Sequence, residues 1–218
     1  MHIDLDDVEN FVALGHTFGS HAVAPVEWPM VWTEPEQTLV EGGEEIVIPP
    51  EVEDAGIGPE LTAVIGEDLH RATPAEAEEA VSALTVSNDI SATGAWPGHP
   101  GGDVTSPAYK MFPTFRPVLT EGVPYDGSDE ERAITAHIDG ETTADSTTEE
   151  MRFTLGEMVA DVSRVLQLEA GDMVALGEPH AEGTLRGAEE VTCEIEGVGE
   201  LSNPIRESED ERVSGLNG

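Results

Sequence analysis

The chain has 218 residues, with 46 acidic side chains against nine basic ones and a formal net charge of −37. Its hydrophobic fraction of 38% is sufficient for a buried core, so the composition excludes a disordered chain and predicts one domain. Because such a charge repels phosphate groups, it argues against a nucleic acid as partner.

The distribution of the acidic residues separates three interpretations. A nucleic-acid mimic would gather its carboxylates on one face, and an acidic tail would confine them to one end, where only the segment 207–211 fits. The carboxylates are instead spread over the whole chain, as in proteins adapted to molar salt, where the Debye length falls to about 3 Å and like charges hardly repel. We therefore predict a protein of the high-salt cytosol of a halophile, without a signal peptide or a membrane span.

The predicted elements are mainly short strands separated by turn residues. They are expected at 45–48, 61–65, 133–138, 173–176 and 191–195. The only cysteine, Cys193, falls in the last of these and excludes an intramolecular disulfide, so we expect it to be a small buried residue.

Two helices are predicted between these strands. The first begins with Thr73 as N-cap, Pro74 at the first position and Glu76 three residues after the cap, and is expected to reach about Ala83. The second covers 155–166, where apolar residues recur at helical spacing. The Gly- and Pro-rich segment 92–109 predicts a long loop, a feature that is usually functional or mobile. The fold class is therefore mainly β with a few helices.

The chain contains a single lysine, Lys110, beside eight arginines. If surface lysines survived by chance in so acidic a chain, several would be expected. The one that remains is therefore a candidate for a specific role, with a buried ion pair as the main alternative.

Five segments occur in a characteristic order. They are G-P-E-L-T-A-V-I-G at 58–66, V-S-N-D-I-S at 86–91, K-M-F-P-T-F-R-P at 110–117, L-E-A-G-D-M-V-A-L-G-E-P at 168–179, and E-I-E-G-V-G-E-L-S-N-P-I at 194–205. Together they resemble the fumarylacetoacetate hydrolase family, from about Phe11 to Ile205. The resemblance implies a β-roll or mixed β-sandwich, which in this family is usually dimeric.

The resemblance also implies a divalent-metal site. The family binds Mg²⁺ or Mn²⁺ through the two glutamates of E-x-E and the aspartate of N-D, and hard ions of this kind prefer oxygen ligands. Glu60 matches the second glutamate and Asp89 the aspartate, while Gly58 stands where the first glutamate is expected. Lys110 matches the lysine that stabilises an enolate or the substrate carboxylate.

Other positions depart from the family pattern. His21 matches the histidine of the N-terminal lid and is a candidate catalytic base, but its glutamate partner would fall near Ala24. Glu34 replaces the lysine of F-x-K-P, and Glu178 replaces the first position after the glycine in T-G-T-P. Either glutamate is an alternative source of the missing third carboxylate, the other interpretation being acidic drift. Candidate substrate-binding residues complete the set: Arg116, Gly177, Pro179 and His99.

These predictions define one expected domain over 1–205. Residues 1–45 would form the lid segment and 46–205 the core, followed by a flexible acidic tail at 206–218. The expected function is a homodimeric, metal-dependent hydrolase or lyase that cleaves a C–C bond in a small 2-oxo or β-diketo acid, such as an acylpyruvate or oxaloacetate. The alternative is a non-catalytic or repurposed member with a degenerate metal site that binds a ligand or a partner.

Overall fold

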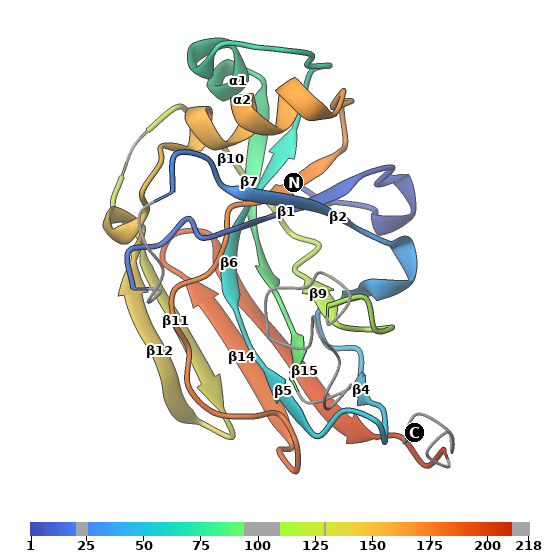
Figure 1. The fold of residues 1–218 in the computed structure, drawn as a ribbon. Helices are drawn as coiled ribbons and strands as arrows, with labels where there is room; N and C mark the ends of the chain where they lie inside the picture. Colours follow the sequence, from blue (N-terminus) through green and yellow to red (C-terminus); the bar gives the residue numbers. More distant parts are fainter. Residues whose placement is uncertain (21–25, 94–109, 129, 211–218) are drawn as a thin grey trace.

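The structure is a computed structural model that describes residues 1–20, 26–93, 110–128 and 130–210. Two curled β-sheets pack against each other, and two helices lie together across one end of the larger sheet (Figure 1). The prediction of a mainly β protein with a few helices is confirmed. Within this part of the chain, no helix is long and apolar enough to span a membrane.

The larger sheet has the strand order β2-β1-β13-β6-β7-β9-β3, and β10 also pairs with β7. Its strands are β1 (Phe11–Gly15), β2 (Met30–Glu34), β3 (Leu39–Glu41), β6 (Pro59–Ile65), β7 (Val81–Asn88), β9 (Arg116–Val118), β10 (Val123–Pro124) and β13 (Met173–Ala175). The central strand β6 runs antiparallel to both β7 and β13. The start of β6 therefore lies beside the ends of its two neighbours.

The second sheet has the order β12-β11-β14-β15-β4. Its strands are β4 (Ile46–Ile48), β11 (Ala133–Ile138), β12 (Glu141–Thr147), β14 (Glu190–Ile195) and β15 (Gly199–Glu207). A separate two-stranded sheet joins β5 (Asp54–Gly56) to β8 (Ser91–Thr93). The strand β15 continues through Glu207 because it pairs in parallel with β4, so it includes the first two residues of the predicted tail. The segment 211–218 lies outside the described residues.

The alternation of side chains along β6 produces two cores. Leu61, Ala63 and Ile65 face the second sheet and join the large core, which includes the buried Cys193. Val64 faces the opposite side and joins a smaller core. Because successive side chains of a strand point to opposite faces, Glu60 lies on the side of the smaller core. Every residue of β6 is buried, so Glu60 is a fully buried carboxylate.

Both helices begin with a capping box, as the sequence of the first one predicts. In α1 (Pro74–Glu79) the cap pairs Thr73 with Glu76, and in α2 (Leu155–Val165) it pairs Thr154 with Glu157. The prediction that the first helix reaches Ala83 is wrong. The chain enters β7 at Val81 instead, because pairing with β6 satisfies its backbone groups and every residue of β7 except Ser82 is buried.

Three-residue 3₁₀ turns occupy Leu5–Asp7, Glu36–Thr38 and Thr148–Glu150.

Candidate metal centre

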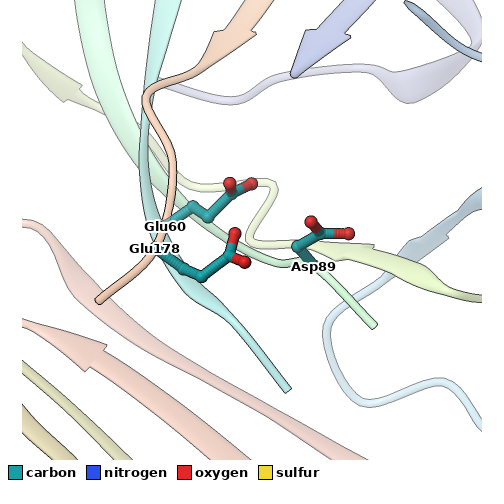
Figure 2. A group of neighbouring side chains, drawn as sticks. All are labelled: Glu60, Asp89 and Glu178. Carbon is teal, nitrogen blue, oxygen red and sulfur yellow. The ribbon is translucent and has the colours of Figure 1, made fainter. Parts of the chain in front are cut away.

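Three carboxylates meet at the end of the larger sheet where the central strand β6 begins. Glu60 is the second residue of β6, Asp89 directly follows β7, and Glu178 lies in the loop after β13. One oxygen of each lies within 4.8 Å of the others, and Figure 2 shows the three side chains converging from separate segments. The antiparallel order of β13, β6 and β7 explains why residues so distant in sequence meet here.

Glu178 occupies the space that a side chain at position 58 would take. A Cβ atom on Gly58 would lie 2.9 Å from Cγ of Glu178, closer than real Cβ contacts allow. The backbone of Gly58 is fixed here, since its N–H donates to Oδ1 of Asn88 (3.1 Å) and its carbonyl accepts from the N–H of Asp89 (2.8 Å). Of the two alternatives for the third carboxylate, the structure therefore brings Glu178 to the cluster.

Glu34 lies behind the cluster and is not one of the three converging carboxylates. Its Oε1 atom accepts a hydrogen bond from Nε1 of Trp32 (2.7 Å) and from Nη2 of Arg116 (3.2 Å). Its Oε2 atom is buried and has no hydrogen-bond partner among the described residues. Arg116 thus pairs with Glu34 as well as with Glu60 and Asp89, and so links Glu34 to the cluster.

Two buried cations face these carboxylates. Lys110 donates to Oδ2 of Asp89 and to Oγ of Ser91 (2.8 Å), and its Nζ lies 5.4 Å from the centre of the Trp32 ring. Arg116, the first residue of β9, donates through Nη1 to Glu60 and places Nη2 2.8 Å from Oδ1 of Asp89.

The pKa values of these groups reflect burial and mutual charge. Burial raises the pKa of Glu60 well above its ordinary value, and the neighbouring Asp89 and Glu178 add to this although Arg116 opposes it. Burial also acts against the charged form of Asp89, but Arg116 and Lys110 outweigh it and lower the pKa of Asp89. Burial would lower the pKa of Lys110, yet Asp89 and Glu178 hold it above the ordinary value, so Lys110 remains an ammonium at neutral pH.

Two features of the cluster suit a divalent cation: its net negative charge and a buried carboxylate oxygen without a hydrogen-bond partner among the described residues. Glu34, Glu60, Asp89 and Glu178 carry four negative charges when ionised, whereas Lys110 and Arg116 carry two positive ones. Two negative charges are thus left over in a buried site, where an uncompensated charge is costly. In addition, Oε1 of Glu60 is buried without a hydrogen-bond partner in the described part of the chain.

The remaining predicted site residues have mixed outcomes. Gly177 is buried with φ +88°, and a Cβ there would lie 2.0 Å from Oγ1 of Thr17, so only glycine fits. Pro179 is also buried. Their contact with substrate stays a prediction, as does that of Arg116, whose guanidinium is directed at carboxylates of the protein. His21, His99 and Ala24 lie outside the described residues.

Sequence reasoning missed Trp32 and Ser91 as neighbours of the single lysine. Ser91 belongs to the same N-D-x-S segment as Asp89, two residues further along, and that spacing was a usable signal. No local signal marks Trp32, because its approach to Lys110 depends on the position of β2 at the sheet edge.

Comparison with known proteins places residues 7–206 in a match to the family model described as fumarylacetoacetate (FAA) hydrolase, C-terminal. An uncharacterized protein of Methanocaldococcus jannaschii is 28% identical over 189 residues, which cover 84% of this chain and 75% of that protein. The 4-hydroxyphenylacetate degradation bifunctional isomerase/decarboxylase of Escherichia coli is 28% identical over 199 residues. That match covers 88% of this chain but only 46% of the enzyme, so the chain spans about half the length of this relative.

Solved structures share the fold. A fumarylpyruvate hydrolase from Pseudomonas aeruginosa, in complex with Mn²⁺ and pyruvate, superimposes with a TM-score of 0.82 at 24% identity, covering 92% of this chain and 91% of that one. A 5-carboxymethyl-2-hydroxymuconate delta-isomerase from Mycobacterium smegmatis also gives 0.82 at 24% identity, covering 93% and 80%.

Proposed function

Since the chain belongs to the fumarylacetoacetate hydrolase family, we propose that it is a divalent-metal-dependent enzyme that cleaves a C–C bond in a small 2-oxo or β-diketo acid. The observation that carries this proposal is the convergence of Glu60, Asp89 and Glu178 in a site whose uncompensated charge, once its four carboxylates are ionised, equals that of Mg²⁺ or Mn²⁺. The fumarylpyruvate hydrolase of the same fold, solved with Mn²⁺ and pyruvate, supports the ion and the substrate class.

Glu60, Asp89 and Glu178 would hold the ion through their carboxylate oxygens. When bound, Mg²⁺ or Mn²⁺ would supply Lewis-acid polarisation of an oxo group. Lys110 would bind the substrate carboxylate or the oxygen on which negative charge develops, because its ammonium is buried and fixed in place before the reaction. Desolvation by the apolar neighbours strengthens that interaction relative to water.

For an oxaloacetate-type substrate, the bond between C3 and the C4 carboxylate breaks and carbon dioxide leaves. The electron pair passes to the 2-oxo group as an enolate, next to the ammonium of Lys110, and a proton from solvent then gives pyruvate. For an acylpyruvate, a water would attack the distal carbonyl with His21 as the candidate base. The bond between C3 and that carbonyl carbon would then break to release a carboxylic acid, and the electron pair would pass to the 2-oxo group as an enolate that takes up a proton to give pyruvate. Because Ala24 replaces the lid glutamate, His21 would need another group to orient it.

We expect Mn²⁺ or Mg²⁺ to raise the melting temperature of the protein in molar KCl, where nonspecific attraction to the acidic surface is screened. An ion at 100 times its Kd adds about 2.7 kcal/mol to the free energy of unfolding. Thermal unfolding of the wild type and of Asp89→Asn with each ion checks this, since the variant keeps the surface charge but loses a ligand. Equal shifts in both proteins would contradict a specific site.

We also expect metal binding to strengthen as the pH rises. Burial raises the pKa of Glu60 well above its ordinary value, so in the metal-free protein Glu60 keeps its proton to a higher pH than an ordinary glutamate, and a bound cation displaces that proton. Asp89, whose pKa is lowered, is already ionised in that range and adds no dependence. Calorimetry in two buffers of different ionisation enthalpy should show proton release above pH 4.5 that disappears in Glu60→Gln. A proton release that persists in the variant would assign it to another group.

The second candidate function is a family member that binds a ligand or partner without catalysis, favoured by Gly58 and Ala24 at positions where the family motif has glutamates. Turnover of oxaloacetate or an acylpyruvate by the wild type in molar salt would eliminate it. The finer predictions also remain part of this proposal: a homodimer, located in the high-salt cytoplasm of a halophile.

A further inference from the structure

Arg116 is an unusual neighbour for a metal site. Its side chain is fully buried, and the guanidinium bonds to Glu60 and lies 2.8 Å from Asp89, two of the three carboxylates that would hold the ion. A fixed cation at this place competes with any bound cation for the same oxygens. The site keeps a higher affinity for a divalent ion if a further carboxylate, outside the three that would hold the ion, also pairs with Arg116.

Glu34 provides that offset. Its side chain is fully buried, and Oε1 lies 3.2 Å from Nη2 of Arg116, the same nitrogen that lies near Asp89. The guanidinium is therefore shared between a carboxylate behind it and the carboxylates of the cluster in front. Glu34 itself does not belong to the converging group of three.

The orientation of Glu34 is fixed by a second contact. Trp32, two residues earlier on β2, donates from Nε1 to the same Oε1 atom at 2.7 Å. The Trp32 ring in turn lies against Lys110, while Arg116 stacks on Phe11 with 5.2 Å between the guanidinium carbon and the ring centre. The carboxylate is thus held in line with the guanidinium by buried groups that are already in place.

We propose that Glu34 is a positioning residue that draws the charge of Arg116 away from Glu60 and Asp89 and so keeps these two carboxylates available to a divalent cation. This inference builds on the proposed metal site. Removal of the charge of Glu34 has two effects of the same sign: the cluster loses a nearby negative charge, and Arg116 binds its other partners more fully. Both effects weaken metal binding.

The test is the affinity for Mn²⁺, measured by calorimetry in molar KCl, of the wild type and of Glu34→Gln. The amide keeps an oxygen that accepts from Trp32 and Arg116, so the fold should survive, which circular dichroism verifies. We expect Glu34→Gln to bind Mn²⁺ about 10 to 100 times more weakly, the range typical of groups that support metal ligands. Glu34→Asp, which keeps the charge, should recover part of this loss.

Glu36→Gln is the matched control. Glu36 is exposed and borders, together with Glu34, a surface pocket of about 310 Å³, so the variant removes the same charge from the same segment. Because molar salt screens exposed charges, its affinity should equal that of the wild type. Equal losses in both variants would instead indicate a general effect of surface charge and would overturn the role of Glu34.

A trivalent probe separates an electrostatic role from a structural one. The binding free energy lost with a nearby negative charge is proportional to the charge of the ion. Glu34→Gln should therefore weaken Tb³⁺ binding by a larger factor than Mn²⁺ binding. A folded Glu34→Gln protein with wild-type affinity, or with equal losses for both ions, would contradict the proposal. A wild type that binds neither ion would contradict the proposed metal site itself.

Discussion

The exchange variant Gly58→Glu/Glu178→Ala is expected to bind Mn²⁺ almost as tightly as the wild type, whereas Glu178→Ala alone should lose binding. Both residues reach the same space, since a Cβ at position 58 would lie 2.9 Å from Cγ of Glu178. A carboxylate from either segment can therefore complete the group with Glu60 and Asp89. Loss of a direct ligand should weaken binding more than the about 10- to 100-fold cost of changing a supporting group.

The backbone at position 58 accepts the exchange. Gly58 is not among the glycines with positive φ, so its backbone conformation permits a side chain. The Cβ atom of residue 178, which alanine keeps, would lie 3.0 Å from the new Cβ, so the exchange requires a shift of a few tenths of an ångström. Gly58→Ala/Glu178→Ala is the matched control, because it fills the space without a carboxylate and should not restore binding. Calorimetry in molar KCl compares the variants. An exchange variant no better than this control, or a Glu178→Ala protein with wild-type affinity, would show that Glu178 is not a ligand.

Replacement of Lys110 by methionine should lower turnover by about 10²- to 10³-fold, the usual cost of removing one group that stabilises developing negative charge. Methionine keeps an unbranched apolar side chain but removes the ammonium that lies over the Trp32 ring and donates to Asp89 and Ser91. Because that ammonium also competes for Asp89, Mn²⁺ should bind the variant at least as tightly as the wild type. Steady-state kinetics with oxaloacetate and an acylpyruvate, alongside Mn²⁺ calorimetry, measure both effects.

The opposite changes in turnover and metal affinity distinguish a catalytic lysine from a structural ion pair. If Lys110 were only a buried partner of Asp89, its loss would leave Arg116 as the one remaining cation that the structure places on Asp89 and would lower stability, but a bound metal ion would restore both stability and turnover. Lys110→Arg, which keeps the charge with a different shape, should fold and remain impaired in turnover. Turnover of Lys110→Met within a few-fold of the wild type would contradict the catalytic role.

The motifs were sufficient to predict the fold class and to select three residues that lie close together in the structure. Glu60, Asp89 and Lys110 each lie within a segment whose neighbours carry the resemblance, and the structure brings all three together. The choice between Glu34 and Glu178 could not be made from spacing. It depends on the antiparallel pairing of β13 with β6, which places the loop after Ala175 beside Gly58.

Two other features depended on tertiary contacts. The helical pattern that begins at Thr73 ends at Glu79 because pairing with β6 claims the following residues for β7. The ion pairs of Arg116 join β9 to the ends of β2 and β7, and no short-range pattern relates those segments. The sequence therefore identified the charged residues of this site, but it did not predict which of them form ion pairs with one another.

Diffraction from a crystal soaked with Mn²⁺ in high KCl, recorded at the manganese absorption edge, tests the metal site most directly. We expect one strong anomalous peak bounded by carboxylate oxygens of Glu60, Asp89 and Glu178, with Arg116 still paired with Glu34. A soaked crystal with no peak among these three carboxylates, or with the ion on other residues, would contradict it.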